Sequence, residues 1–170
     1  LYPQFSTTTS GSSLKSWKKE VDMKKYKVPT KIICCYPEDK DFISAHVHEI
    51  NKVLNIAKNK NKKKKDIRLL FSAHGLPEKI IKKGDPYQNQ VEKTVSKVVD
   101  SLNNNEFLHT ICYQSKVGPL KWIGPSTEEE IIKASKKNEV IILIPIAFVS
   151  EHSETLVELD IEYKEVALNN

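Results

Sequence analysis

Val140-Ile141-Ile142-Leu143-Ile144 is the most strand-like run in the chain, and its composition decides the fold that we expect. β-Branched or leucine side chains fill every position, and polar residues do not alternate with apolar ones. Strands that are buried on both faces have this composition, whereas a strand with one face in water alternates. Three further strand-like runs lie upstream, at residues 32–36, 67–71 and 107–113. The sequence therefore predicts four buried strands.

Helical patterns lie between and after these runs. Apolar residues recur every three or four positions over residues 43–57, and again after Asp85-Pro86, which supplies an N-cap and a proline at the first helical position. Ser126 and Glu129 have the spacing of a capping box, and residues 150–166 are typical of a final helix. We therefore expect an α/β fold of the Rossmann type, a parallel four-stranded sheet with helices on both faces.

The length of 170 residues, 39% of them hydrophobic, suits one domain with a core of its own. Residues 1–30 are polar and rich in turn formers, so we interpret them as a linker or loop segment that precedes an α/β domain over residues 31–170. The hydroxyl-rich stretch 6–13 leaves a second interpretation open, namely a loop that holds a phosphate or a carboxylate group.

The formal net charge is +5, and six of the eight residues from 58 to 65 are lysine. No aromatic residue is interleaved for base stacking, so this run favours a solvated loop and we expect no nucleic-acid partner. The three cysteines form no CxxC motif, which gives no sign of a disulfide framework or a structural zinc site and favours a reducing compartment. The apolar run 140–149 contains Pro145 and is too short to span a bilayer.

Residues with useful chemistry follow the predicted strands, where open parallel sheets bind their ligands. His74 follows the second run, Gln114-Ser115 follow the third, and Glu151-His152 follow the fourth. A histidine there can exchange protons near neutral pH or bind a metal, although a purely structural hydrogen-bonding role is equally open.

The final helix carries Glu151, Glu154, Glu158 and Glu162 at steps of three, four and four, which predicts a single stripe of carboxylates. Such a stripe is either an ordinary solvated face or a binding surface for a divalent cation. His152 adds a nitrogen ligand beside oxygen ligands, a set that suits Fe²⁺ or Zn²⁺ better than Ca²⁺.

Four blocks of the sequence, in the same order, resemble the ferrochelatase family. They are Leu69-Leu70-Phe71-Ser72-Ala73-His74-Gly75-Leu76-Pro77, Gly84-Asp85-Pro86-Tyr87, Tyr113-Gln114-Ser115-Lys116-Val117-Gly118-Pro119, and Pro145-Ile146-Ala147-Phe148-Val149-Ser150-Glu151-His152 with the residues up to Tyr163. The opening residues 1–6 and 11–13 are similar to that family as well. The resemblance covers nearly the whole chain.

The resemblance implies insertion of Fe²⁺ into protoporphyrin IX, or into coproporphyrin III, to form haem. Ferrochelatases have two similar α/β domains that face each other across a porphyrin cleft, and this chain looks like the second of them. By that mapping, His74 and Glu154 correspond to the active-site histidine and glutamate, and Glu151, His152 and Glu158 to an acidic metal path. Whether His74 accepts a proton or first binds iron stays open, and we favour the proton acceptor.

The resemblance also sets expectations for partners. Porphyrin and ferrous iron are expected as substrates. Some relatives hold a [2Fe–2S] cluster, but the helix expected over residues 42–54 contains no cysteine, so we expect no cluster. Two alternatives stay open: a metal- or porphyrin-binding half that turns over only with a partner chain or a second copy, and a chelatase for cobalt or nickel. We expect a bacterial cytoplasmic location, with peripheral membrane association, a mitochondrion or a plastid left open.

Overall fold

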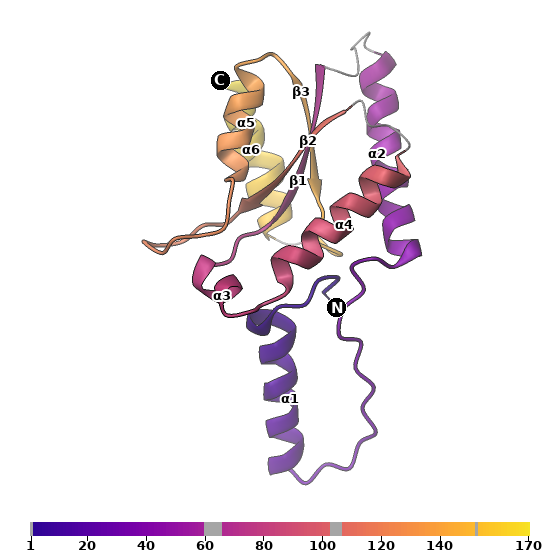
Figure 1. The fold of residues 1–170 in the computed structure, drawn as a ribbon, viewed down its shortest axis with the longest axis vertical. Coiled ribbons are helices and arrows are strands. Elements are labelled where there is room, and N and C mark those ends of the chain that lie inside the picture. Colours follow the sequence, from indigo (N-terminus) through magenta and orange to yellow (C-terminus); the bar gives the residue numbers. More distant parts are fainter. Residues whose placement is uncertain (1, 60–65, 103–106, 152) are drawn as a thin grey trace.

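The computed structural model describes residues 2–59, 66–102, 107–151 and 153–170. Within them, β1 (Ile67–His74) is the central strand of a three-stranded parallel sheet, between β2 (Leu108–Gln114) and β3 (Val140–Pro145) (Figure 1). The register places Leu70 beside Thr110 on one side and beside Leu143 on the other. The parallel sheet is confirmed, with three strands where four were expected.

Helices cover both faces of the sheet, as predicted. The helices α2 (Lys40–Asn59) and α4 (Tyr87–Ser101) lie on one face, and α5 (Thr127–Ser135) and α6 (Tyr163–Leu168) on the other (Figure 1). Side chains of β1 alternate between the two layers: Leu69 and Phe71 join the core under α2 and α4, whereas Leu70 joins the core under α5 and α6. All three are fully buried, which explains why the strand sequence is apolar throughout.

The predicted helical stripes become the buried faces of the helices. The buried positions are Ile43, Ile50, Leu54 and Ala57 on α2, and Tyr87, Val91, Val95 and Val98 on α4. Asp85 accepts a hydrogen bond from the Tyr87 backbone N–H at 3.0 Å, which satisfies a donor at the start of α4. The helix α5 begins after Ser126 as expected, but the Ser126 side chain makes no capping hydrogen bond, so the capping box is not formed.

Residues 32–36 do not form the expected fourth strand, and that prediction is wrong. The side chain of Ile33 is 64% exposed, and the Tyr36 N–H donates to the carbonyl of Pro3 at 2.8 Å instead of to a strand. A short apolar run forms a strand only where its backbone can make hydrogen bonds to the edge strand of a sheet. The sequence pattern of the run does not show whether such an edge is nearby.

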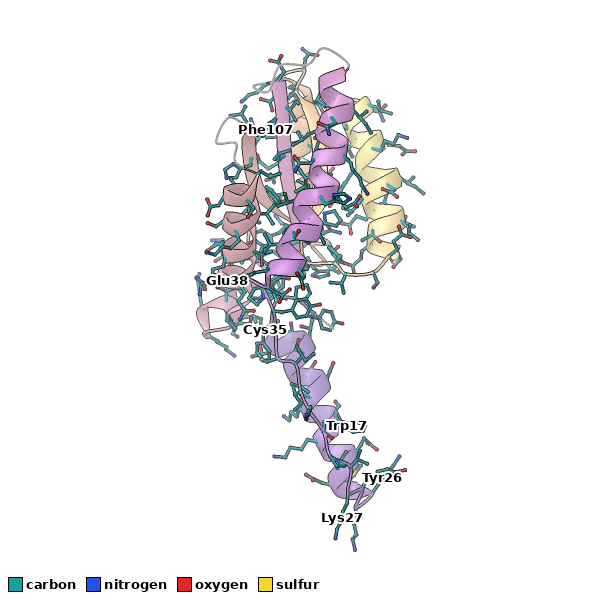
Figure 2. All side chains as sticks on the ribbon, turned by 90° about the vertical axis from the view of Figure 1, so that its right-hand side faces the viewer. Trp17, Tyr26, Lys27, Cys35, Glu38 and Phe107 are labelled. Atoms are coloured by element: carbon teal, nitrogen blue, oxygen red, sulfur yellow. The ribbon has the colours of Figure 1, made fainter. Side chains whose placement is uncertain are left out.

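The interpretation of residues 1–30 as a linker is wrong over residues 7–23. This segment forms a short π-helical turn, η1 (Thr7–Gly11), and then α1 (Ser12–Met23). Figure 2 shows α1 extending away from the rest of the molecule, with Trp17 and Tyr26 far from the sheet. No residue of α1 is buried.

Two shorter helices complete the described chain. The helix α3 (Glu78–Lys82) follows β1. The predicted final helix begins at Glu154 and not at residue 150, and its first part is a π-helix, η3 (Glu154–Glu162), which leads into α6. Among the described residues, no helix combines the length and the apolar character that a membrane crossing requires.

Candidate functional site

A cavity of about 430 Å³ lies at the carboxyl end of the sheet, where β1 ends at His74. Open α/β sheets bind ligands at this edge. Its walls come from the N-terminal segment, the end of β1, the start of α4, the loop after β3 and the first turn of η3. The lining residues are Tyr2, Gln4, Ser6, Thr8, Thr9, His74, Leu76, Tyr87, Ala147, Phe148 and Glu154.

His74 is held in one tautomer by the backbone. Its Nδ1 atom lies 2.7 Å from the carbonyl oxygen of Gly75, and because a carbonyl oxygen only accepts, Nδ1 must be the donor. In the neutral imidazole, Nε2 then keeps its lone pair. The side chain is 40% exposed, so this nitrogen can accept a proton from a molecule in the cavity.

Glu154 is the second predicted site residue at this cavity. Its Oε2 atom lies 3.8 Å from Nε2 of His74, and its side chain is 35% exposed. This distance is too long for a direct hydrogen bond, but it allows an ion pair once the imidazole is protonated. His74 and Glu154 come from parts of the sequence 80 residues apart, at the end of β1 and the start of η3.

The turn after His74 requires glycine because the chain passes close to β2 there. The Gly75 N–H donates to the Gln114 carbonyl at 2.9 Å. A Cβ atom at position 75 would lie 2.9 Å from that carbonyl oxygen and 3.2 Å from the Trp122 ring. Any side chain at this position would therefore push apart the ends of two strands, and with them the backbone that orients His74.

Glu158 does not lie on the cavity. Its Oε1 atom accepts from the Ser115 N–H and the Tyr163 hydroxyl, each at 2.9 Å, and its Oε2 atom accepts from Ser115 Oγ at 2.6 Å and Gln114 Nε2 at 3.1 Å. Burial and this hydrogen bond raise the pKa of Tyr163, which stays a donor. Four donors occupy the Glu158 carboxylate, so in this structure it holds η3 against the end of β2.

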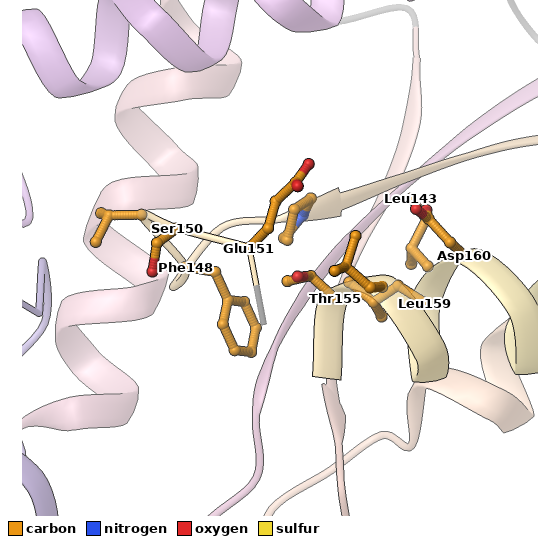
Figure 3. Close-up of a pocket in the computed structure, with 10 residues that line it drawn as sticks. Leu143, Phe148, Ser150, Glu151, Thr155, Leu159 and Asp160 are labelled. Carbon is orange, nitrogen blue, oxygen red and sulfur yellow. The ribbon is translucent and has the colours of Figure 1, made fainter. Parts of the chain in front are cut away.

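Glu151 faces a different cavity, of about 370 Å³ (Figure 3). This second cavity lies between the end of β3 and η3, and Asp160 is also among its lining residues. Phe148 lines both cavities and so forms part of the wall between them. His152, the remaining predicted metal ligand, lies outside the described residues.

The prediction of a single carboxylate stripe is therefore wrong. Glu151 precedes the helix, Glu154 points to the first cavity, and Glu158 turns to β2. Glu151 lies before the helix begins, and hydrogen bonds from Ser115 and Tyr163 hold the Glu158 carboxylate away from the cavity that Glu154 lines. Within the described part of the chain, no three His, Cys, Asp or Glu side chains gather closely enough to hold a metal ion.

A chain of hydrogen bonds between side chains joins β1, β2, α5 and η3, the elements around the site. Ser72 donates to Gln114 Oε1 at 2.7 Å, and its contact of 2.9 Å with the Thr127 hydroxyl must then use the Thr127 proton. Gln114 in turn donates to Glu158. The sequence placed Gln114 at a strand end but gave no sign of its partners, Ser72 on β1 and Glu158 on η3. The chain of hydrogen bonds fixes the relative positions of β1, β2 and η3.

The N-terminal wall of the cavity was also missed. Ser6 and Thr7 donate to the carboxylate of Asp85, 79 and 78 residues away. The second interpretation of the hydroxyl-rich stretch, a loop that holds a carboxylate, therefore describes this wall. Tyr87 lies beside it, and burial raises the pKa of its phenol, which stays neutral near pH 7.

The cysteines take no part in either cavity. Cys34 is exposed, Cys35 is half-buried and Cys112 is buried, and all three are free thiols. Burial raises the pKa of Cys112 to about 12, so this thiol is not a nucleophile near neutral pH.

Comparisons with known proteins agree with one another. A profile of the ferrochelatase family matches residues 1–170. The ferrochelatase of Pelagibacter ubique (strain HTCC1062) is 59% identical over 167 residues, which cover 98% of this chain and 46% of that protein. The ferrochelatase of Rickettsia prowazekii (strain Madrid E) is 53% identical with the same coverage, and that of a Wolbachia species from Drosophila simulans (strain wRi) is 51% identical. The chain spans about half the length of these curated relatives.

Proposed function

The chain belongs to the ferrochelatase family, and from this membership we propose that it inserts Fe²⁺ into protoporphyrin IX or coproporphyrin III to give haem. The observation that carries the proposal is the convergence of His74 and Glu154 on one cavity at the carboxyl end of the sheet. The metal ion and the porphyrin are both substrates here.

His74 is the proposed proton acceptor. Metal insertion releases two pyrrole N–H protons from the macrocycle, so a base that works near neutral pH is required. The Gly75 carbonyl fixes the Nδ1 proton of His74, and the Nε2 lone pair is left to take a proton from a pyrrole nitrogen in the cavity. Each transfer converts a pyrrole N–H into a nitrogen that binds the metal, and converts the neutral imidazole into an imidazolium ion.

Glu154 is the proposed partner of that imidazolium. Its carboxylate lies 3.8 Å from Nε2, where a negative charge stabilises the protonated ring and can relay the proton onward to water. Removal of the negative charge would disfavour proton transfer without removing contacts to the flat faces of the macrocycle. Glu154 thus contributes to the metallation rate more than to porphyrin affinity.

The approach of ferrous iron is assigned to the second cavity. Glu151 and Asp160 supply carboxylate oxygens there, and Phe148 separates this cavity from the one that contains His74 and Glu154. Carboxylates suit a hydrated divalent cation that must be released again, because few ligands hold it. His152 stays part of the proposed metal path on the resemblance alone. We leave Glu158 out of it, since four hydrogen-bond donors already occupy its carboxylate.

A second candidate function is that of a metal- or porphyrin-binding half; the chain matches about half of each relative described above. In this alternative the chain binds porphyrin or metal but turns over only when another chain supplies the rest of the cleft. The two candidates differ in one measurable property, which is whether the chain metallates porphyrin by itself.

Zinc insertion tests both candidates, because zinc porphyrin is fluorescent and its formation can be followed continuously. The assay combines the chain, protoporphyrin IX and Zn²⁺, and is repeated with the half of the Pelagibacter relative that this chain does not match. Turnover by the chain alone supports the first candidate, and turnover only after mixing supports the second. No turnover in either assay, with porphyrin binding absent as well, would contradict both.

Several finer predictions belong to this proposal. We propose that the enzyme works without a [2Fe–2S] cluster and without a nucleic-acid partner, and that it is located in the bacterial cytoplasm. Binding to a membrane surface and pairing with a second copy stay open.

A further inference from the structure

The N-terminal segment is attached to the rest of the molecule through polar groups on one side of α4. Gln4 Nε2 donates to Thr94 Oγ1 at 3.0 Å, and the Phe5 N–H donates to Gln90 Oε1 at 2.7 Å. Just before the same helix, Asp85 accepts hydrogen bonds from the next two residues of the segment, Ser6 and Thr7. This arrangement matters because Gln4, Ser6, Thr8 and Thr9 line the cavity that contains His74.

Asp85 accepts more hydrogen bonds from the N-terminal segment than Thr94 or Gln90 does. Its Oδ2 atom accepts from Thr7 Oγ1 at 2.6 Å, from the Thr7 N–H at 2.7 Å and from Ser6 Oγ at 3.0 Å. Its Oδ1 atom accepts from the Tyr87 N–H. One buried carboxylate therefore joins two walls of the cavity, the N-terminal segment and the start of α4.

We propose that Asp85 is a positioning residue, whose carboxylate holds residues 4–9 in place as a wall of the cavity and thereby shapes the porphyrin-binding surface. This inference rests on the proposed function, since it concerns the same cavity. Asp85 itself does not line the cavity, so it acts through Ser6, Thr7 and Tyr87.

The charge of Asp85 is the property on which the proposal depends. Three donors converge on Oδ2, and hydrogen bonds to an ionised acceptor are shorter and stronger than those to a neutral one. Burial alone would raise the pKa of Asp85, but the hydrogen bonds from Thr7, Tyr87 and Ser6 together lower it. An asparagine has the same shape, but its NH₂ group would face either the three donors at the Oδ2 position or the Tyr87 N–H at the Oδ1 position, and it could accept from neither.

Hydrogen–deuterium exchange on the 170-residue chain tests the contact directly. In Asp85→Asn, exchange of residues 4–9 should rise about tenfold or more, while exchange of residues 67–74 in β1 stays unchanged. The matched control is Asp100→Asn, which removes the same charge from an exposed position on α4 and should change neither segment. Unchanged exchange of residues 4–9 in Asp85→Asn would overturn the proposal. An equal rise in both segments would overturn it as well, because Asp85 would then support the whole fold.

A second pair of variants separates hydrogen bonding from packing. Thr7→Val keeps the shape of the side chain but loses the hydroxyl donor, and Thr7→Ser keeps the donor. Metal-free protoporphyrin IX, followed by its fluorescence, should bind several-fold more weakly to Thr7→Val and Asp85→Asn, and normally to Thr7→Ser. Normal porphyrin affinity in Asp85→Asn, with residues 4–9 loosened, would overturn the positioning role. If the unsubstituted chain binds no porphyrin, the proposed function fails for the isolated chain, and the exchange experiment still decides whether Asp85 holds the wall.

Discussion

Nε2 of His74 and Oε2 of Glu154 lie 3.8 Å apart, although one residue ends β1 and the other begins η3. Because Nδ1 of His74 is held by the Gly75 carbonyl, the nitrogen that faces Glu154 is the one with a lone pair. This geometry suits the proposed roles of the pair, a base and a carboxylate that stabilises its protonated form.

Replacement of His74 by alanine should remove the proton acceptor. We expect zinc insertion to fall by about 100-fold or more in any assembly that turns over, since general base catalysis contributes on that scale. The side chain is 40% exposed, so the melting temperature should stay within a few degrees of that of the unsubstituted chain. His48→Ala, at an exposed position on α2, is the control. Near-normal activity in His74→Ala would remove His74 from the mechanism.

Replacement of Glu154 by glutamine should slow metal insertion more than it weakens porphyrin binding, because the substitution removes charge and keeps shape. A rate loss of about tenfold or more, with an affinity change of less than about threefold, is the expected result. Single-turnover metallation gives the rate and porphyrin fluorescence titration gives the affinity. Glu165→Gln, at an exposed position on α6, is the control. Equal losses of rate and affinity would indicate a packing role instead.

Replacement of Gly75 by alanine should disturb the fold and the site together. The new Cβ atom would meet the Gln114 carbonyl oxygen at 2.9 Å, so β1 and β2 must separate at their carboxyl ends. We expect a loss of about 1–3 kcal/mol in the free energy of unfolding, measured with urea. Gly124→Ala is the comparison, because a Cβ atom there is 3.8 Å from its nearest neighbour. A Gly75→Ala variant as stable as the unsubstituted chain would contradict the close approach.

The far end of β1 should affect stability without affecting the site. Arg68 donates to both oxygens of Glu139, at 2.9 and 3.1 Å, with both side chains mostly buried. Arg68 and His74 are six positions apart on the strand, about 20 Å. Glu139→Gln should therefore lower the free energy of unfolding by about 2 kcal/mol and leave porphyrin affinity unchanged. Glu49→Gln, which breaks an exposed pair with Lys52, should lower the free energy of unfolding much less. Equal costs for the two variants would contradict the mostly buried position of the Arg68–Glu139 pair.

The contribution of Asp85 to stability should depend on pH. Its folded-state pKa is lowered below the ordinary value of about 3.9, so its stabilisation is complete above that pH and is lost as pH falls through the folded pKa. The difference in unfolding free energy between the unsubstituted chain and Asp85→Asn should thus be largest near pH 7 and shrink below about pH 4. Urea titrations at several pH values measure it. A difference that stays constant with pH would mean that the charge of Asp85 is not involved.

Much of the fold could be predicted because it depends on local patterns. The apolar run at 140–144 predicts a buried strand, and the stripe from Tyr87 to Val98 predicts a helix with one buried face. Residues 32–36 have a similar composition, but their strand would have needed a sheet edge, and the Tyr36 N–H bonds to Pro3 instead. The local pattern therefore predicted the strands that pair with another strand of the described sheet. It failed for residues 32–36, which do not pair with that sheet.

The sequence predicted at which edge of the sheet the site lies, because that edge follows from the order of residues along the strands. It did not predict how the acidic side chains are arranged there. The sequence placed His74 and Glu154 at the right edge of the sheet, but it predicted a stripe of acids that the structure does not form. The separation arises because Glu151 precedes η3 and because four donors hold Glu158 against Gln114, Ser115 and Tyr163. The contacts of Asp85 with Ser6 and Thr7 span 78 or 79 residues, a distance over which no periodicity gives information.

A double-mutant cycle on His74 and Glu154 tests most directly whether the two residues act on the same proton. The single variants His74→Ala and Glu154→Gln are compared with the double variant in zinc insertion by the active assembly. The account predicts that the double variant is about as slow as His74→Ala, since a carboxylate that stabilises an imidazolium has nothing to stabilise once the ring is gone. Rate losses that multiply in the double variant would mean that the two residues act independently, and would contradict the account.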